Sequence, residues 1–173
     1  MYPNEALITR FYTCFRARDA AGMKACYHPD VVFSDPVFGR LEGEQVGAMW
    51  AMLCSRAADL EIEFSGVSAD AEKGRAHWDA RYTFSQTGRK VLNQIDAEFG
   101  FRDGLIARHD DRFSFWRWSK QALGPAGAAL GWTPLLRARV GANARKGLAA
   151  YMRKHISSTG PAAADAGSLS DDA

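Results

Sequence analysis

Two polar residues in the last alternating segment of the chain could perform acid–base chemistry. His109 and Asp111 are two residues apart, so in a strand they share one face, and Phe113 continues that face. A histidine and an aspartate on an apolar face need partners, because burying an unpaired polar group is costly. We expect Asp111 to orient or charge the His109 imidazole, which would make the two an acid–base pair.

Asn93 is predicted to point into the same interior. Alternation from Val91 to Phe101 places Asn93 on the apolar face of the preceding strand. There it would position a substrate oxygen or a water molecule. The alternative is that His109, Asp111 and Asn93 form a satisfied polar network that fixes the sheet.

Asp35 is a further candidate for proton transfer, and it directly precedes Pro36. In an apolar cavity the charged form of an aspartate is disfavoured, so its pKa rises towards values that suit catalysis. An Asp-Pro pair also opens turns, with the carboxylate capping its own loop. The sequence is compatible with both roles.

Motifs for metals, nucleophiles and phosphates are missing from the sequence. The four histidines show no paired ligand spacing, no serine lies in a strand-to-helix nucleophile motif, and no glycine-rich phosphate loop is present. We therefore expect neither a metal nor a cofactor. Cys14, Cys26 and Cys54 fit no zinc or redox spacing, and we predict all three in helical segments, as small buried side chains in a reducing compartment.

Length and composition predict one folded domain. A chain of 173 residues is too short for two comfortable domains, and its hydrophobic share of 47% fits a real core. No apolar run approaches the roughly 18 residues of a membrane span, and no secretory signal is readable at the N-terminus. We expect a cytoplasmic protein.

The hydrophobic period changes along the chain, from helical to alternating. Three-and-four spacing predicts helices over 4–18, 20–27 and 44–57, with a short strand at 31–33 between the last two. Alternation then predicts strands over 60–64, 76–84, 91–101 and 105–118. Helices followed by an antiparallel meander predict an α+β fold, with the helices packed on one face of a curved, mostly antiparallel sheet.

A basic helix is predicted after the strands. Thr133 can cap it, Pro134 can open it, and it runs to about His155. The composition after residue 156 predicts a disordered tail. The expected organisation is therefore a folded domain over 1–118, a basic helical extension over 119–156 and a disordered tail over 157–173.

The extension has an unusual charge pattern. From Arg112 to His155 there are nine Lys/Arg residues and no acidic residue. We expect this helix to pack over the cavity or a dimer interface. A membrane-surface contact is a lesser alternative, and nucleic acid is not the expected partner.

Four groups of residues resemble a known superfamily. Phe15 to Asp19, His28 to Asp30, and Phe33 to Pro36 followed by Gly39 and Gly43 are similar in order and spacing to the opening of ketosteroid isomerases and SnoaL-like proteins of the nuclear-transport-factor-like superfamily. The resemblance covers roughly residues 5–118. It implies a cone-shaped fold whose open end admits a small hydrophobic molecule, and dimers formed through the sheet.

The resemblance also implies a role for Asp35, since the matching aspartate of ketosteroid isomerase is the general base. The oxyanion hole of that enzyme does not carry over. Its donor tyrosine falls on Phe11, with Tyr12 one residue away, and its protonated acid falls nearest Ala97. We therefore expect a reaction other than steroid isomerisation.

Together these features predict a cofactor-independent acid–base enzyme, an isomerase, cyclase, dehydratase or hydrolase acting on a small hydrophobic molecule. The alternative is a non-catalytic ligand-binding or interaction protein on the same scaffold, and in either case we expect a homodimer. The expected catalytic residues are Asp35, His109 and Asp111. The expected ligand contacts are Asn93, Tyr12, Phe15, Phe33, Trp50, Trp78 and Phe113.

Overall fold

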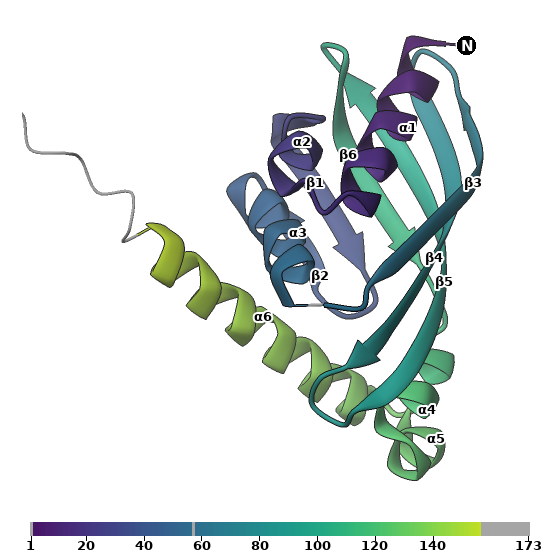
Figure 1. Ribbon diagram of the computed structural model, residues 1–173, viewed down its shortest axis with the longest axis vertical. Coiled ribbons are helices and arrows are strands. Elements are labelled where there is room, and N and C mark those ends of the chain that lie inside the picture. The colour runs from purple at the N-terminus through teal and green to yellow at the C-terminus, as the bar shows by residue number, and fades with distance from the viewer. Residues whose placement is uncertain (1, 57, 157–173) are drawn as a thin grey trace, which may run out of the picture.

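A curved sheet wraps around the N-terminal helices in the computed structural model, which describes residues 2–56 and 58–156 and, at Ile156, only the backbone (Figure 1). The first helices are α1 (Pro3–Arg16), α2 (Ala20–Lys24) and α3 (Glu44–Arg56). The strands are β1 (Tyr27–Asp35), β2 (Gly39–Glu42), β3 (Glu61–Ala69), β4 (Lys73–Phe84), β5 (Arg89–Arg102) and β6 (Leu105–Arg112). The last helices are α4 (Phe115–Leu123), α5 (Pro125–Leu130) and α6 (Pro134–Ile156).

The strand order β2-β1-β6-β5-β4-β3 brings the two candidate acidic segments together. All neighbouring pairs are antiparallel except β1 and β6, which run parallel with Ser34 opposite Asp110. Parallel strands end at the same edge of a sheet. Asp35 and Asp111, each one residue further along, therefore lie next to each other.

The α+β architecture with a mostly antiparallel curved sheet confirms the predicted fold class. Helices α1, α2 and α3 cover the concave face of the sheet in Figure 1. Ile8, Phe11 and Val46 are fully buried beneath them in the main core. The Asp103–Gly104 turn has φ angles of 53° and 74°, which is the left-handed geometry that a tight hairpin demands.

The segment after β6 differs from the prediction of a strand to Trp118. The strand ends at Arg112, and α4 begins at Phe115, where the Ser114 hydroxyl accepts a hydrogen bond from the Arg117 backbone amide over 3.2 Å. The aromatic residues fit both periods, and the helix cap decides between them. The domain boundary predicted at 118 consequently falls inside α4, and the tail predicted over 157–173 lies outside the described residues.

The start of β1 also differs from the prediction. Helix α2 ends at Lys24, and Tyr27 already pairs with Ile106, so the strand begins four residues before Val31. Pro29 restricts only His28, so it does not by itself decide where α2 ends. Cys26 therefore lies in the turn between α2 and β1, and only Cys14 and Cys54 are helical.

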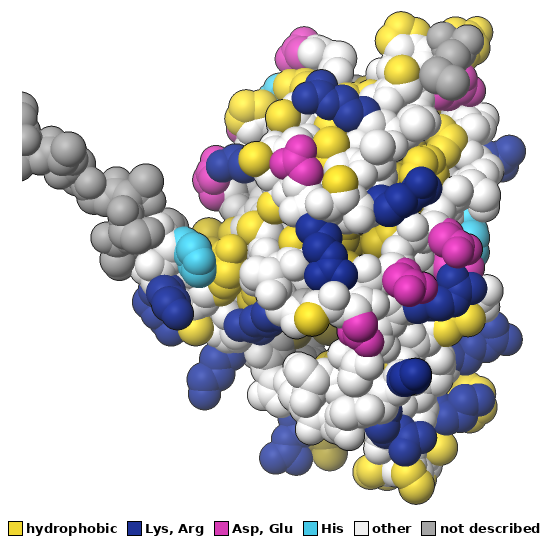
Figure 2. Space-filling view, in the orientation of Figure 1, with side chains coloured by type: hydrophobic (Ala, Val, Ile, Leu, Met, Phe, Trp, Pro, Cys, Tyr) yellow, Lys and Arg dark blue, Asp and Glu magenta, His cyan; other side chains and the backbone are white. Residues whose placement is uncertain are grey.

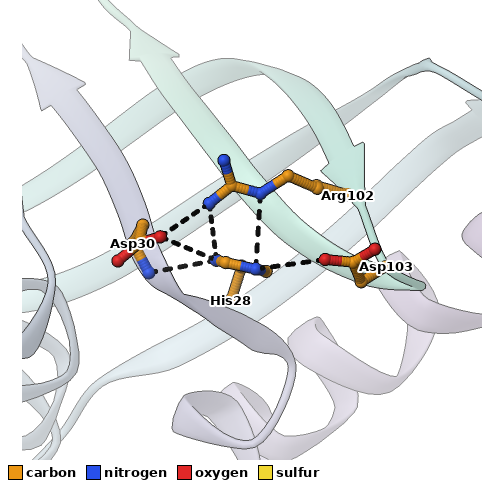
Figure 3. A network of polar contacts seen from close by, with 4 residues as sticks. All are labelled: His28, Asp30, Arg102 and Asp103. Carbon is orange, nitrogen blue, oxygen red and sulfur yellow. Dashed lines mark hydrogen bonds and ion pairs between the residues drawn. The ribbon is translucent and has the colours of Figure 1, made fainter.

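A polar network ties the start of β1 to the turn between β5 and β6 (Figure 3). Arg102 donates to Asp30 Oδ2 over 3.0 Å, and His28 Nε2 lies 3.5 Å from Asp103 Oδ2. None of these four residues lines the main cavity. The network therefore belongs to the scaffold.

The α6 helix extends the cone. It starts beside α4 and α5 and runs past α3 (Figure 1). Leu148 is buried on its inner side, and Val140, Ala144 and Met152 pack against the cores. These residues form the apolar side of α6.

Candidate active site

A cavity of about 300 Å³ lies inside the cone, with walls from α3, β4, β5, α4 and α6. Most of its lining is apolar, as in typical small-molecule sites. The polar side chains that line it are Asp35, Arg56, Tyr82, Thr83, Ser85, Gln86, Asn93, Asp111 and Asn143. Carboxylates in such a cavity are surrounded by few competing water molecules, so their charges matter more than at the surface.

A buried chain of hydrogen bonds stands behind the cavity wall. Trp50 Nε1 donates to Tyr27 Oη over 2.8 Å, and Tyr27 Oη lies 2.7 Å from His109 Nδ1. His109 Nε2 lies 2.9 Å from Asp111 Oδ1. His109 is 0% exposed and Asp111 is 4% exposed.

The chain fixes the proton positions when His109 is neutral. Because Trp50 can only donate, the Tyr27 oxygen accepts from it, and the tyrosine proton is then directed at His109 Nδ1. Nε2 therefore carries the imidazole proton and donates it to Asp111. Every member of the chain is satisfied in this arrangement, as a buried polar network requires.

Asp111 presents the end of that chain to the cavity. Its Oδ1 accepts from His109 and, over 3.3 Å, from Trp78 Nε1. Both donors therefore contact the same carboxylate oxygen. No hydrogen bond from the described residues reaches Oδ2, although the side chain lines the cavity. This oxygen is suited to accept a proton from a bound molecule.

Asp35 has a raised pKa. Burial, assisted by the nearby Asp111 charge and opposed by two backbone amides, raises its pKa to about 7. Those amides belong to Val37 and Phe38 and donate to Oδ1 over 2.8 Å and 2.6 Å. Asp35 thus both caps its own turn and lines the cavity, so both roles expected for it are present.

The two carboxylates also border a second, more open hollow of about 380 Å³. Its other lining residues include Ser34, Arg108 and Arg137, so it is polar. The acidic pair therefore lies between an apolar cavity and a polar one.

Tyr82 adds a donor to the cavity. Trp118 Nε1 donates to Tyr82 Oη over 2.8 Å, which leaves the tyrosine proton available to another acceptor. Burial raises the Tyr82 pKa, Trp118 opposes that rise, and the Asp35 charge adds to it. Tyr82 therefore stays protonated within electrostatic reach of Asp35.

The comparison with known sequences identifies the family. The SnoaL-like domain profile matches residues 8–109, which is more than half of the chain. The chain belongs to the SnoaL-like domain family. None of the curated proteins matches its sequence. In this SnoaL-like protein, α4, α5 and α6 all lie beyond the matched residues, yet α4 and α6 help to line the cavity.

Solved structures share the cone fold. A putative polyketide cyclase from Silicibacter sp. TM1040 is 23% identical with a TM-score of 0.58, and the match covers 67% of this chain and 92% of that chain. An LEH-like epoxide hydrolase from M. tuberculosis is 17% identical with a TM-score of 0.60, and the match covers 74% of this chain and 95% of that chain. TerC, co-crystallised with polyporic acid, is 19% identical with a TM-score of 0.61, covering 70% and 99%.

The residues predicted from the sequence divide into two groups in this SnoaL-like protein. Those that line the cavity are Asp35, Asp111, Asn93, Phe15, Trp50, Trp78 and Phe113. His109, Tyr12 and Phe33 do not line it. All three are fully buried, and His109 is joined to the cavity-lining residues Asp111, by a hydrogen bond, and Trp50, by ring stacking.

The positions that match the oxyanion hole of ketosteroid isomerase hold no donor here. Phe11 and Ala97 are buried apolar residues, and the neighbouring Asp96 is bonded to His77 on the outer face of the sheet, over 2.7 Å. The Tyr12 hydroxyl is buried and has no hydrogen-bond partner among residues 2–56 and 58–156.

Sequence reasoning missed several residues of the site. Tyr82 shares a face with Trp78 in the alternating segment, and this alternation could have indicated that Tyr82 lines the cavity. Tyr27 was assigned to a helix, which hid its contact with His109. Arg56 and Asn143 gave no sequence signal, because their place at the cavity depends on how α3 and α6 pack together.

Proposed function

We propose that this SnoaL-like protein is a cofactor-independent acid–base enzyme that moves a proton beside a carbonyl group of a small apolar molecule. The observation that carries the proposal is the pair of neighbouring carboxylates, Asp35 and Asp111, in one apolar cavity. Their environments differ, because Asp111 accepts hydrogen bonds from the side chains of His109 and Trp78, whereas burial raises the pKa of Asp35 to about 7. Two titratable groups in contrasting environments are typical of an acid and a base.

In the proposed step Asp111 is the base. Its Oδ2 takes a proton from the carbon next to the carbonyl, and the electrons of that C–H bond form a carbon–carbon double bond. The carbonyl π electrons move to the oxygen, which receives a proton or hydrogen bond from Asp35 and a hydrogen bond from Tyr82. Returning the proton to a different carbon gives an isomerase, and attack of the enolate on a second carbonyl gives a cyclase.

His109 acts as a positioning residue in this proposal. Its Nε2–H bond holds Asp111 in place, and Tyr27 fixes the ring from the other side. Asn93 lines the same cavity and would orient the substrate. The structural relatives include a putative polyketide cyclase and an epoxide hydrolase, which supports a small organic substrate, as does the TerC complex with polyporic acid.

Deuterium exchange tests the proposal. The protein is incubated in D₂O with a panel of aromatic and polycyclic ketones and β-keto esters, and carbon-bound deuterium is measured by mass spectrometry. We expect catalysed exchange for members that fit the cavity, at least about 100-fold slower in Asp111→Asn. If protonated Asp35 supplies the acid, the wild-type rate falls as the pH rises through about 7.

Asp110→Asn is the matched control. Asp110 is the next residue of β6 and does not line the apolar cavity, since it is bonded to Ser34 and paired with Arg108. Exchange should continue in this variant. Panel molecules that bind without any exchange above buffer would contradict catalysis and favour the alternative, a non-catalytic ligand-binding protein.

The homodimer and the cytoplasmic location also stay predictions. Size-exclusion chromatography with light scattering tests the homodimer. A monomer at all concentrations would contradict it.

A further inference from the structure

Large apolar side chains protrude from one end of the molecule. Leu130, Trp132 and Leu135 fall within six residues at the junction of α5 and α6 and are 51%, 75% and 79% exposed. Trp116 of α4 is 41% exposed and reaches the same place, since its Nε1 donates to the Ala128 carbonyl over 3.1 Å. We name these four residues the apolar tip. Exposed apolar groups clustered in this way usually mark an interaction site.

Positive charge surrounds the apolar tip. Arg117 and Lys120 lie on α4, with the Lys120 ammonium 4.4 Å from the centre of the Trp116 ring. Arg139 lies one helical turn after Leu135, on the same face of α6. No acidic residue occurs between Arg112 and His155. The lower end of Figure 2, where α4 and α5 lie, shows hydrophobic and basic side chains and no acidic one.

The apolar tip is held rigidly. A Cβ on Gly127 would lie 1.9 Å from the Ser119 carbonyl oxygen. The backbones of α4 and α5 are therefore in direct contact at Gly127, because glycine has no side chain to separate them. Both exposed tryptophans donate Nε1–H to backbone carbonyls, Trp132 to Ala129 over 2.8 Å. Their polar atoms are therefore satisfied within the protein while the rings stay exposed. Ordering this surface on binding costs little entropy.

We propose that the apolar tip and its surrounding cations bind the surface of an anionic lipid bilayer. Tryptophan and leucine side chains enter the interfacial layer of a membrane, and nearby Lys and Arg residues pair with anionic headgroups. Within residues 2–56 and 58–156 no helix is long and apolar enough to cross a membrane, so the contact is peripheral.

Other occupants fit the charge and shape less well. A second copy docked by the same patch would bring Arg and Lys residues against their equivalents, because such an interface is self-complementary. Nucleic acid would favour stacked aromatic rings, but two of the four protruding side chains are leucines, which offer no ring to a base.

The apolar tip lies on the same helices that line the cavity. Trp118 and Leu123 of α4 and Val140 of α6 line the cavity, so the elements that carry the tip also form the cavity wall. An apolar ligand dissolved in a bilayer would then have a short path into the protein. The membrane contact does not depend on catalysis.

Vesicle flotation tests this proposal with the full chain. The probes are vesicles of phosphatidylcholine with about 30% phosphatidylglycerol, and vesicles of phosphatidylcholine alone. We expect the protein to float with the anionic vesicles and to be released as salt rises from about 0.1 M to about 0.5 M. Trp132→Ser with Leu135→Ser should lower the partition coefficient at least about tenfold.

Matched controls distinguish binding by the apolar tip from nonspecific hydrophobic adsorption and from nonspecific electrostatic attraction. Tyr2 is 62% exposed at the opposite end of the molecule, so Tyr2→Ser should bind like the wild type. Arg139→Glu should weaken binding at least about fivefold, whereas Arg10→Glu, the same change on exposed α1 surface, should weaken it less. Asp35→Asn should bind vesicles normally.

The substituted tip residues are exposed, so circular dichroism and the melting temperature should be unchanged in their variants. Failure to float with anionic vesicles would overturn the proposal, as would equal binding by the doubly substituted tip variant. A concentration-dependent dimer that this variant loses, without vesicle binding by the wild type, would assign the surface to a second copy instead.

Discussion

Tyr27 Oη lies 2.7 Å from His109 Nδ1. In the neutral imidazole this contact determines that the proton is on Nε2, the nitrogen that bonds Asp111. Tyr27 lies at the start of β1 and His109 in the middle of β6, 82 residues later. The Trp50 donor at the same oxygen gives the hydrogen bond its direction. The hydrogen bond that Asp111 receives from His109 therefore depends on a tyrosine that does not line the cavity.

Tyr27→Phe should destabilise the protein. The substitution leaves Trp50 Nε1 and His109 Nδ1 without partners in a fully buried site. An unsatisfied buried polar group costs about 1–3 kcal/mol, so we expect the free energy of unfolding in urea to fall by about 2 kcal/mol or more.

Tyr12→Phe is the matched comparison. Tyr12 and Tyr27 are both buried, at 0% and 7% exposure, but the Tyr12 hydroxyl has no hydrogen-bond partner in the described part of the chain. Removing it should leave the free energy of unfolding unchanged or raise it by about 1 kcal/mol. Equal losses in the two variants would show that ring packing, and not the Tyr27 network, controls the stability of this region.

Asp35 should make stability depend on pH. The pKa of Asp35 is about 7 in the folded protein, whereas its ordinary value, which applies to the unfolded chain, is 3.8. Between pH 3.8 and about pH 7 the folded state therefore holds a proton that the unfolded state lacks. The Asp35 contribution is therefore most favourable below the lower value and is lost as the pH rises through the upper one. The slope reaches about 1.4 kcal/mol per pH unit.

Comparison with Asp35→Asn isolates this contribution from the other titrating groups. Urea unfolding at several pH values from about 4 to about 8 should show the stability of the wild type falling relative to the variant up to about pH 7, and no further trend above it. A constant difference across the range would mean that Asp35 titrates normally in the folded protein.

The sequence predicted the helices and the meander because each of these segments follows one hydrophobic period. The same alternation placed Asn93 and Asp111 correctly at one interior. It failed after Arg112, where aromatic residues fit both periods and the cap at Ser114 begins α4. Local periodicity cannot resolve such a segment.

The remaining site residues depend on contacts between distant segments. Asp35 meets Asp111 through the parallel pairing of β1 with β6, and no local pattern encodes that register. Likewise, α6 reaches the cavity by packing on α3. The sequence predicted this helix and its packing over the cavity or a dimer interface, but not which of its residues line the cavity.

Gly127→Ala should loosen the junction of α4 and α5. The added Cβ would lie 1.9 Å from the Ser119 backbone oxygen, which cannot move as freely as a side chain. We expect a loss of about 1–3 kcal/mol in the free energy of unfolding. Gly147→Ala in α6 is the control, since its nearest neighbour is the flexible end of Arg56 at 3.4 Å, and it should gain about 0.5–1 kcal/mol. Similar effects of both substitutions would contradict the close packing at Gly127.

Ala144→Phe should block the cavity from the α6 side. Ala144 lines the cavity, so a phenylalanine ring at this position would occupy part of its volume of about 300 Å³. We expect binding of the fluorescent apolar dye 1-anilinonaphthalene-8-sulfonate to weaken at least about tenfold, because the lost space removes burial for the ligand. Ala142→Phe provides the control on the exposed side of the same helix and should bind the dye like the wild type. Unchanged dye binding in Ala144→Phe would place the bound molecule elsewhere, and α6 would then not be a wall of the site that ligands occupy.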